Sequence, residues 1–291
     1  MAFLLTKILG RLSQKYPSIS APLNMLSLLK IKIDKGGILF CNSDDLLDLV
    51  MSRVGSRIKY SNKFYTEELL NNSELKLQFL EMSKKYNHFK FKSWEDRVNS
   101  LPGNIAIYYS LVRELRPKLM VETGTATGSM TSFILAALHE NDYGNLISID
   151  LRSNAGKLTM DLNLEKEDIG YWIPAKYKDR WNYKEGDAKV LLPEIFQKNE
   201  INFFIHDSLH TRTHMMFEYA VARALMKPKS IIASDDILWN NIFDDFLKSH
   251  NLIGYSPNCN PNIGVTVNDF DSFETNIGLE IVKNPNKLNC D

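Results

Sequence analysis

After Pro117, short apolar segments alternate with stretches of helical spacing, and this alternation limits the fold more than any other feature of the chain. Five of the apolar segments have the length of a strand, and they lie at residues 118–124, 145–151, 181–187, 201–207 and 230–236. Parallel strands need a crossover between them, which is usually a helix. We therefore predict an α/β fold, a Rossmann-like, doubly wound and mostly parallel sheet with helices on both faces.

The C-terminal part of the chain departs from this alternation. Apolar segments at residues 251–258 and 262–269 lie too close together for a helix to fit between them. They predict a hairpin, which would complete a seven-stranded sheet and give it an antiparallel edge.

The first hundred residues have a different texture. Residues 1–100 show mostly helical and loop patterns, so we predict a helical N-terminal region for docking, lid or oligomerisation, with the sheet domain in 101–291. Apolar side chains near the start follow helical spacing at Phe3, Leu4, Ile8 and Leu12. Such a helix would dock on its own domain or on a second subunit, and a membrane-surface helix is the less favoured interpretation.

Every predicted strand of the parallel part ends in a carboxylate. The acids at these ends are Glu122, Asp150, Asp187, Asp207 and the pair Asp235–Asp236. A single acid at such a place is often a turn former or a helix cap, which explains part of the set. The carboxyl ends of parallel strands nevertheless share one edge, where open α/β sheets bind ligands.

The first of these strands runs into a glycine-containing loop, "ETGTATG" from Glu122. Gly124 and Gly128 do not have the G-x-G-x-x-G spacing of a dinucleotide site, and no Gly-Lys-Ser/Thr of a phosphate loop follows. Asp150 lies 22 residues beyond Gly128, where a carboxylate can accept both hydroxyls of a ribose. The combination predicts a nucleoside ligand without a diphosphate, and Glu122 would suit a positively charged one.

Composition narrows the range of partners and compartments. Lys and Arg number 35, and so do Asp and Glu, so the formal net charge is zero and no basic excess indicates a nucleic-acid partner. The three cysteines, Cys41, Cys259 and Cys290, are widely spaced and odd in number, which favours reduced thiols in a cytoplasmic protein. No apolar run reaches the length of a membrane span.

Several motifs in order resemble one family, the class I S-adenosylmethionine-dependent methyltransferases. The chain is similar more narrowly to methyltransferase family 24 and the macrocin O-methyltransferase-like small-molecule enzymes. The resemblance runs from about Leu101 to Thr266. It is carried by the strand-to-loop stretch "KLMVETGTATGSMTSFIL", by "LISIDL", by "NYKEGDAKVLLPEI", by "FFIHDSLH" and by "IIASDD".

The resemblance implies a residue-by-residue assignment of the S-adenosylmethionine site. Loop residues would line the methionine moiety, Asp150 would hold the ribose, and Asp207 would border the cofactor from the fourth strand end. The implied loop residues are Glu122, Gly124, Thr125 and Gly128. Asp187 and Ala188 would lie beside the adenine, although Asp187 also suits the cap of a following helix.

Methyl transfer to an alcohol needs a base, a metal ion, or both. Asp207, Asp235 and Asp236 supply hard oxygen ligands from two neighbouring strand ends, which suit Mg²⁺ or another divalent cation. The alternative is that these acids only cap helices and end strands. His210 follows Asp207 by three residues, and we expect it to act as the general base or an additional polar ligand near the acceptor.

Other aromatic and histidine side chains near these motifs have weaker interpretations. His206 and His214 do not form a zinc site with His210, because His206 belongs to a strand and no H-E-x-x-H occurs. Trp239 would shape the acceptor pocket or pack in the core. The long segment 154–177, with Tyr171 and Trp172, would form a lid or a surface excursion.

The leading prediction is a divalent-metal-assisted O-methyltransferase that acts on a small hydroxylated molecule, such as a sugar or glycosylated product. A metal-independent enzyme that uses His210 is the second. A cofactor-binding interaction protein without catalysis is the third, and the carboxylates at every strand end argue against it. An enzyme for NAD or a nucleotide sugar is the fourth, and the loop spacing opposes it.

Overall fold

The structure is a computed structural model that describes residues 36–85, 93–100, 104–151, 169–258 and 261–269. The predicted N-terminal helix around residues 3–12, and residues 154–168 of the predicted lid, lie outside the described residues.

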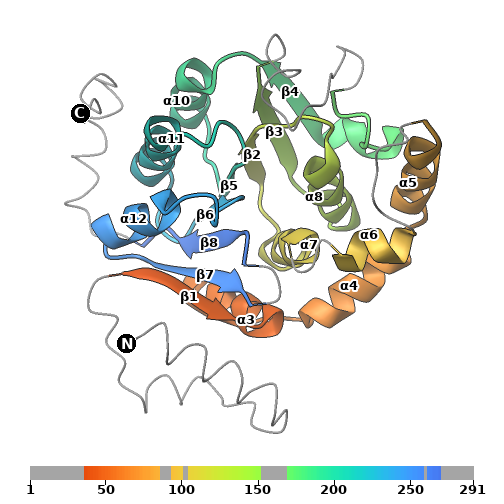
Figure 1. Ribbon diagram of the computed structural model, residues 1–291, viewed down its shortest axis with the longest axis horizontal. Helices are drawn as coiled ribbons and strands as arrows, with labels where there is room; N and C mark the ends of the chain where they lie inside the picture. Colours follow the sequence, from red (N-terminus) through yellow and green to blue (C-terminus); the bar gives the residue numbers. More distant parts are fainter. Residues whose placement is uncertain (1–35, 86–92, 101–103, 152–168, 259–260, 270–291) are drawn as a thin grey trace, which may run out of the picture.

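The described residues form one sheet with helices on both faces (Figure 1). The strands are β1 (Gly37–Cys41), β2 (Leu119–Thr123), β3 (Asn145–Asp150), β4 (Trp181–Glu185), β5 (Phe203–His206), β6 (Ile231–Ser234), β7 (Ile253–Pro257) and β8 (Gly264–Val267). The helices are α3 (Ser43–Val54), α4 (Asn62–Leu70), α5 (Ser73–Lys85), α6 (Trp94–Ser100), α7 (Asn104–Leu115), α8 (Ser129–Glu140), α10 (Ala188–Lys198), α11 (Arg212–Leu225), α12 (Ile242–Ser249) and a 3₁₀ helix, η3 (Ala175–Arg180).

The strand order confirms the predicted fold class and adds one strand to it. The order is β1-β7-β8-β6-β5-β2-β3-β4, and β8 is antiparallel to both of its neighbours while the other pairs are parallel. The seven predicted strands are all present, including the β7–β8 hairpin. The eighth, β1, comes from the region predicted as helices and loops, and it pairs with β7, so the edge of the sheet is parallel there.

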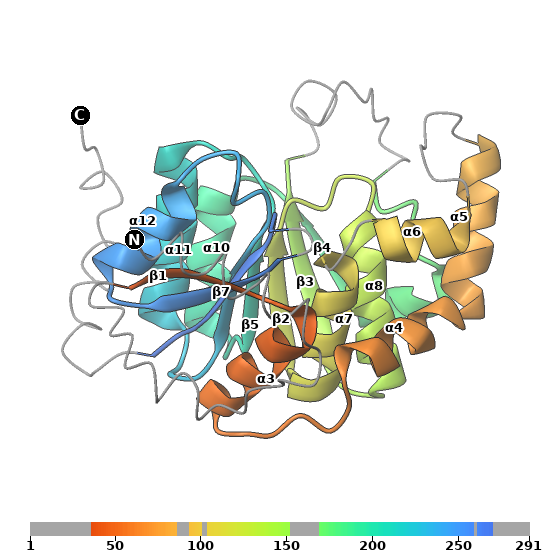
Figure 2. The ribbon, with the colours of Figure 1, turned by 60° about the horizontal axis from the view of Figure 1, so that its bottom comes forward.

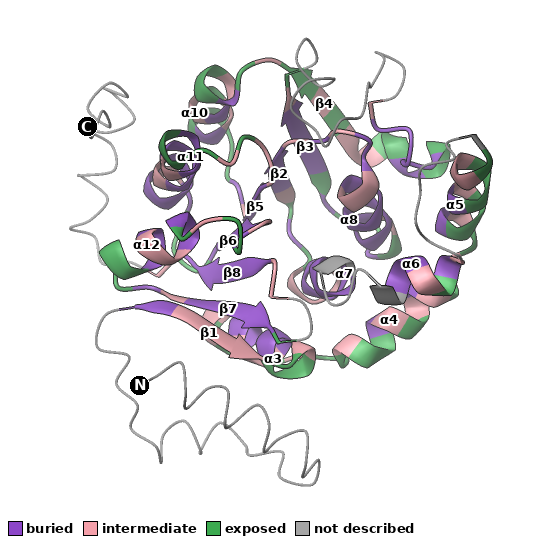
Figure 3. Cartoon of the chain, viewed as in Figure 1, coloured by how far each residue is buried: buried purple, intermediate pink, exposed green. Residues whose placement is uncertain are grey.

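The hydrophobic core has two layers, one on each face of the sheet. Alternate strand residues point to opposite faces: Phe203 and Ile205 pack in the cluster under α7 and α8, whereas Phe204 packs in the cluster under α10, α11 and α12. Figure 2 shows these two groups of helices on either side of the sheet. Figure 3 shows the central strands buried and the edge strand β4 partly exposed.

The helices α4 and α6 pack onto α7 and α8 through polar and apolar contacts respectively. Glu68 of α4 accepts hydrogen bonds from Tyr109 Oη and from Arg113 Nε, the latter at 2.8 Å. Trp94 of α6 stacks on Phe133 of α8 with ring centroids 5.9 Å apart. In the part of the chain that the structure describes, no helix is long and apolar enough to cross a membrane.

Candidate active site

The site begins at the carboxyl edge of the sheet, where β2 lies between β3 and β5. The chain leaves β2 to form β3 and β4 on one side and returns to form β5 and β6 on the other. Such a reversal of strand order opens a crevice above the strand ends, which is where ligands bind in this class of sheet. The predicted acids and the glycine loop lie at this edge.

The two loop glycines are required by close packing. Gly124 has φ +85°, and a Cβ there would lie 1.9 Å from the carbonyl oxygen of Asp207. Gly128 has φ +78°, caps the N-terminus of α8, and would place a Cβ 2.7 Å from the Cα of Gly170. The glycines therefore let the loop contact the segment after β5 and the segment before η3, with the α8 N-terminus facing the crevice.

Asp150 ties this loop to the end of β3. Its Oδ2 accepts hydrogen bonds from the backbone N–H groups of Thr125 and Ala126, both at 2.7 Å. Within the described residues Oδ1 has no hydrogen bond, so one carboxylate oxygen remains for a ligand. Thr125 itself is buried, and its Oγ1 has no partner among the described side chains.

Glu122 lies beneath the loop and is fully buried. Its Oε1 accepts from Thr131 Oγ1 at 2.7 Å and from Ser148 Oγ at 2.6 Å, while Oε2 has no partner in the described part of the chain. Trp181 Nε1 donates to the same Ser148 hydroxyl at 2.7 Å. Burial raises the pKa of Glu122 to about 7, against the lowering effect of these two hydroxyls.

Asp187 caps the helix that follows β4. Its side chain accepts from the backbone N–H of Lys189 at 2.8 Å, it is exposed, and the adjoining Ala188 is buried at the start of α10. The capping role that the sequence allowed is therefore present, and it leaves the second carboxylate oxygen facing solvent.

Three carboxylates follow β5 and β6, and their charges affect one another. Burial and the charges of Asp235 and Asp236 hold the pKa of Asp207 well above its usual range. Burial and the charge of Asp236 raise the pKa of Asp235 to about 7. Among the described residues, however, no three His, Cys, Asp or Glu side chains converge closely enough to hold a metal ion. The donors share one region without forming a complete ligand set.

His210 lies beside these acids, half-buried. Its Nε2 is 3.8 Å from Asp236 Oδ2, and its ring is 5.1 Å from the ring of His206 and 5.5 Å from that of Trp239. Burial, reinforced by His206, lowers the pKa of His210, so its imidazole is neutral at neutral pH. Trp239 is exposed and contacts the histidine from the solvent side, which differs from a core position.

A buried acid that no sequence motif singled out, Glu218 of α11, organises this edge. Glu218 is fully buried and bonds to His206 Nδ1 at 2.6 Å and to His214 Nε2 at 2.8 Å. The two histidines are thus partners of one carboxylate. An acid on the apolar face of "THMMFEYA" was the available sign, since a buried charge needs partners.

Tyr171 and Trp172, predicted in a lid, are both buried. Trp172 stacks on Phe79 of α5 with ring centroids 5.9 Å apart, and the carbonyl of Tyr171 accepts a bond from Gln78 Nε2. The Trp172 ring and the Tyr171 backbone therefore connect the segment before η3 to α5.

Buried polar atoms without a partner gather at the carboxyl edge. Within the described residues they include Tyr108 Oη, Glu122 Oε2, Thr125 Oγ1, His206 Nε2, His210 Nε2 and Asp235 Oδ1. An unpaired buried polar atom costs free energy and is rare in a folded protein. So many at one edge indicate a place where a polar ligand supplies the missing bonds.

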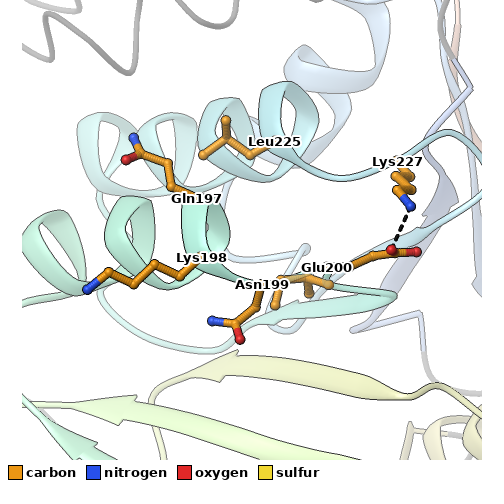
Figure 4. A pocket seen from close by; sticks show the side chains of 7 residues that line it. Gln197, Lys198, Asn199, Glu200, Leu225 and Lys227 are labelled. Carbon is orange, nitrogen blue, oxygen red and sulfur yellow. Dashed lines mark hydrogen bonds and ion pairs between the residues drawn. The ribbon is translucent and has the colours of Figure 1, made fainter.

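A hollow between the C-terminal ends of α10 and α11 has a different character (Figure 4). It is lined by Gln197, Lys198, Asn199, Glu200, Ile201, Leu225 and Lys227. These residues lie next to the start of β5, at the opposite edge of the sheet from the acids. Their charged groups are satisfied on the surface, as in the Lys227–Glu200 ion pair, so this hollow is no part of the candidate site.

Comparison with known proteins identifies the kind of domain that part of this chain resembles. Residues 121–237 match the family model described as a methyltransferase domain, and this segment runs from β2 to just beyond β6. The match confirms the resemblance to class I methyltransferases. This part of the chain is therefore similar to a methyltransferase domain, and its glycine loop and strand-end acids lie at the edge described above.

Solved structures with a similar arrangement are distant in sequence. The O-methyltransferase from Bacillus cereus in complex with SAH is 14% identical, with 71% of this chain and 96% of that chain covered and a TM-score of 0.47. TomG from Streptomyces achromogenes, an O-methyltransferase of tomaymycin synthesis in complex with SAM, is 13% identical, with 71% and 94% covered and a TM-score of 0.48.

A magnesium- and SAM-bound form of CmcI is 16% identical, with 57% of this chain and 71% of that chain covered and a TM-score of 0.39. No curated protein matches the chain. Likenesses at this level say nothing of the acceptor or of a metal in this protein.

Proposed function

We propose that the protein transfers the methyl group of S-adenosylmethionine to a hydroxyl oxygen of a small molecule. The observation that carries the proposal is the group of unpartnered buried polar atoms at the carboxyl edge, next to the glycine loop. A polar ligand at this edge would supply hydrogen bonds to these atoms, and all of them except Tyr108 Oη lie in the segment that matches the methyltransferase domain.

The cofactor would lie across the loop after β2. Asp150 Oδ1 would accept the ribose hydroxyls while Oδ2 keeps the loop amides in place. Gly124, Thr125 and Gly128 would border the methionine moiety, with Glu122 buried beneath the loop. On the far side of β3, Asp187 and Ala188 would border the adenine.

The acceptor would lie over Asp207 and His210. Methyl transfer is an in-line displacement at the sulfonium, so the enzyme must align the acceptor oxygen and remove its proton. His210 is neutral, half-buried and next to Asp236, so its imidazole can take that proton and the neighbouring carboxylate can stabilise the resulting charge. A sugar hydroxyl or a glycosylated product is the class that the family resemblance favours.

A divalent cation such as Mg²⁺ fits the chemistry of the donors. Burial and the charges of Asp235 and Asp236 raise the pKa of Asp207, burial and the charge of Asp236 raise that of Asp235, and Asp235 Oδ1 has no partner in the described part of the chain. A bound cation would lower the pKa of an acceptor hydroxyl. A second reading, catalysis by His210 without metal, is favoured by the absence of three converging ligands among the described residues.

Turnover distinguishes the two readings. Formation of S-adenosylhomocysteine from S-adenosylmethionine would be measured with a panel of free and glycoside-linked sugars, with Mg²⁺ and then with EDTA. The metal-assisted proposal predicts activity that EDTA abolishes, Mg²⁺ restores and Asp235→Asn lowers by roughly 100-fold or more. Activity that survives EDTA but not His210→Ala supports the metal-independent reading. A panel that includes hydroxyl-free amines and thiols, with turnover only on those, would contradict O-methylation.

A further inference from the structure

A single buried carboxylate, that of Glu218, bonds to both sides of the candidate site. Its Oε2 accepts from Thr123 Oγ1 at 2.7 Å and from His206 Nδ1 at 2.6 Å. Its Oε1 accepts from Ser208 Oγ at 2.9 Å and from His214 Nε2 at 2.8 Å. Each oxygen therefore has two donors, which is the full hydrogen-bonding capacity of an ionised carboxylate.

The two histidines among these donors keep the carboxylate charged although it is completely buried. Burial acts to raise the pKa of Glu218, but the His206 and His214 side chains outweigh it and hold that pKa well below its usual range. An ionised carboxylate accepts and never donates, so His206 must carry a proton on Nδ1 and direct it at Glu218. The orientation of the His206 ring follows from this bond.

The bonded residues flank the parts of the site that face ligands. Thr123 is the last residue of β2 and immediately precedes Gly124 of the cofactor loop. His206 and Ser208 immediately precede and follow Asp207, which Glu218 does not contact. Since β5 ends at His206, Glu218 bonds to the last residue of the strand and to the second residue of the loop that follows it, on either side of Asp207.

The two loops also touch through their backbones. The N–H of Asp207 donates to the carbonyl of Thr123 at 2.9 Å, and the Asp207 carbonyl occupies the space that a side chain at Gly124 would need. A shift at either strand end would move the other. One acid on α11 thus holds the end of β2 and the end of β5 at a defined spacing.

We propose that Glu218 is a positioning residue that fixes the cofactor loop relative to the acceptor loop, acting through Thr123 on one side and through His206 and Ser208 on the other. The inference rests on the proposed cofactor site. It assigns to Glu218 no contact with cofactor or substrate. The effect on the cofactor passes through Thr123, and the effect on the acceptor side passes through Ser208.

The test is calorimetric titration of S-adenosylhomocysteine into the full chain and four variants, each with its unfolding temperature measured without ligand. Glu218→Gln keeps the shape but replaces one acceptor oxygen with a donor, so two of the four bonds are lost. We expect S-adenosylhomocysteine to bind roughly tenfold more weakly, equivalent to one lost charge-assisted hydrogen bond. Thr123→Val removes only the cofactor arm and should weaken binding similarly.

Two matched controls separate positioning from general stability. Glu68→Gln alters another carboxylate that accepts bonds from a tyrosine and an arginine, far from the loop, and should lower the unfolding temperature without changing affinity. Ser208→Ala removes one bond of the acceptor arm and none of the cofactor arm, and it should leave S-adenosylhomocysteine affinity within about twofold of wild type.

The outcomes are distinct. Unchanged affinity in both Glu218→Gln and Thr123→Val, with wild type binding normally, would overturn the inference. So would weakened binding in Glu68→Gln equal to that in Glu218→Gln, because the effect would then follow stability alone. If Glu218→Gln does not fold, Thr123→Val decides the matter. A wild-type protein that does not bind S-adenosylhomocysteine would instead contradict the proposed function itself.

Discussion

At the scale of single residues, Glu122 shows how burial changes the chemistry of a loop acid. The sequence places it at a strand end, where it could have been exposed to solvent. The structure buries it fully, with two hydroxyls on Oε1 and none on Oε2. Its raised pKa means that the folded protein holds a proton there which the unfolded chain releases above about pH 4.5.

Stability should therefore fall as pH rises through the range from about 4.5 to about 7, because only the folded state keeps this proton. The contribution of Glu122 is fully present below pH 4.5 and is lost, by about 3 kcal/mol at most, near pH 7. Urea unfolding of wild type and Glu122→Gln at several pH values would measure it. The stability difference between them should shift in favour of Glu122→Gln as pH rises, and a constant difference would contradict the assignment.

The loss of stability on substituting the loop glycine, Gly124, depends on the space around it as well as on its φ. Gly124→Ala should destabilise the fold by about 3 kcal/mol, because the new Cβ meets the Asp207 backbone in addition to the cost of a positive φ. Gly55→Ala has a similar φ, +89°, but its Cβ would approach only Lys229 Nζ, so it should cost about 1 kcal/mol. Chemical denaturation measures both, and equal losses would show that packing of the two loops is looser than described.

At the scale of elements, most strands and helices were predictable from the sequence, whereas strand β1 and the hydrogen bonds of Glu218 were not. Six of the seven predicted strands follow from apolar runs that are largely buried on both faces, whereas β4 is a partly exposed edge strand with a weaker apolar pattern. The strand β1 was missed since "GILFC" is short and stands among helical patterns. Glu218 was missed because a helical acid is usually solvated, and only the fold brings Thr123 and His206 to it.

Asp187, the N-cap of α10, has a structural role in the helix and a proposed role in cofactor binding, and substitutions can distinguish the two. Asp187→Ala should cost about 1 kcal/mol of stability through loss of the N-cap bond. Asn42→Ala removes the equivalent cap of α3, where Asn42 accepts from Asp45 N at 2.8 Å, at similar cost. Only Asp187→Ala should also weaken S-adenosylhomocysteine binding in a calorimetric titration. Unchanged affinity in both variants would show that Asp187 caps α10 and takes no part in binding.

At the scale of the whole molecule, β1 makes the N-terminal part of the chain continuous with the sheet. It pairs along its full length with β7, and Ile38 N donates to Asp244 Oδ1 of α12 at 3.2 Å. The predicted division at residue 100 remains a prediction, but residues 37–41 share the sheet with residues 253–257. No pattern in "GILFC" could have shown a pairing partner more than 200 residues away.

Labelling of Cys41, the last residue of β1, would show whether this strand separates from the sheet before the rest of the protein unfolds. Burial, with a smaller effect of Asp45, raises the pKa of its thiol to about 12, so it should resist alkylation while β1 is paired. In a chain carrying Cys259→Ser and Cys290→Ser, iodoacetamide labelling in urea should follow the loss of circular dichroism. Labelling well below the unfolding transition would show that β1 detaches alone.

The carboxyl edge above β2 and β3 is the proposed binding site of the methyl donor. Calorimetric titration of S-adenosylhomocysteine into wild type, Asp150→Asn and Asp142→Asn tests it most directly. Asp150→Asn retains an oxygen for the loop amides but loses the charge, while Asp142 is an exposed acid paired with Arg180 outside the site. We predict binding by wild type and Asp142→Asn and a loss of roughly tenfold or more in Asp150→Asn. Equal affinity in all three folded proteins, or none in the wild type, would contradict the claim.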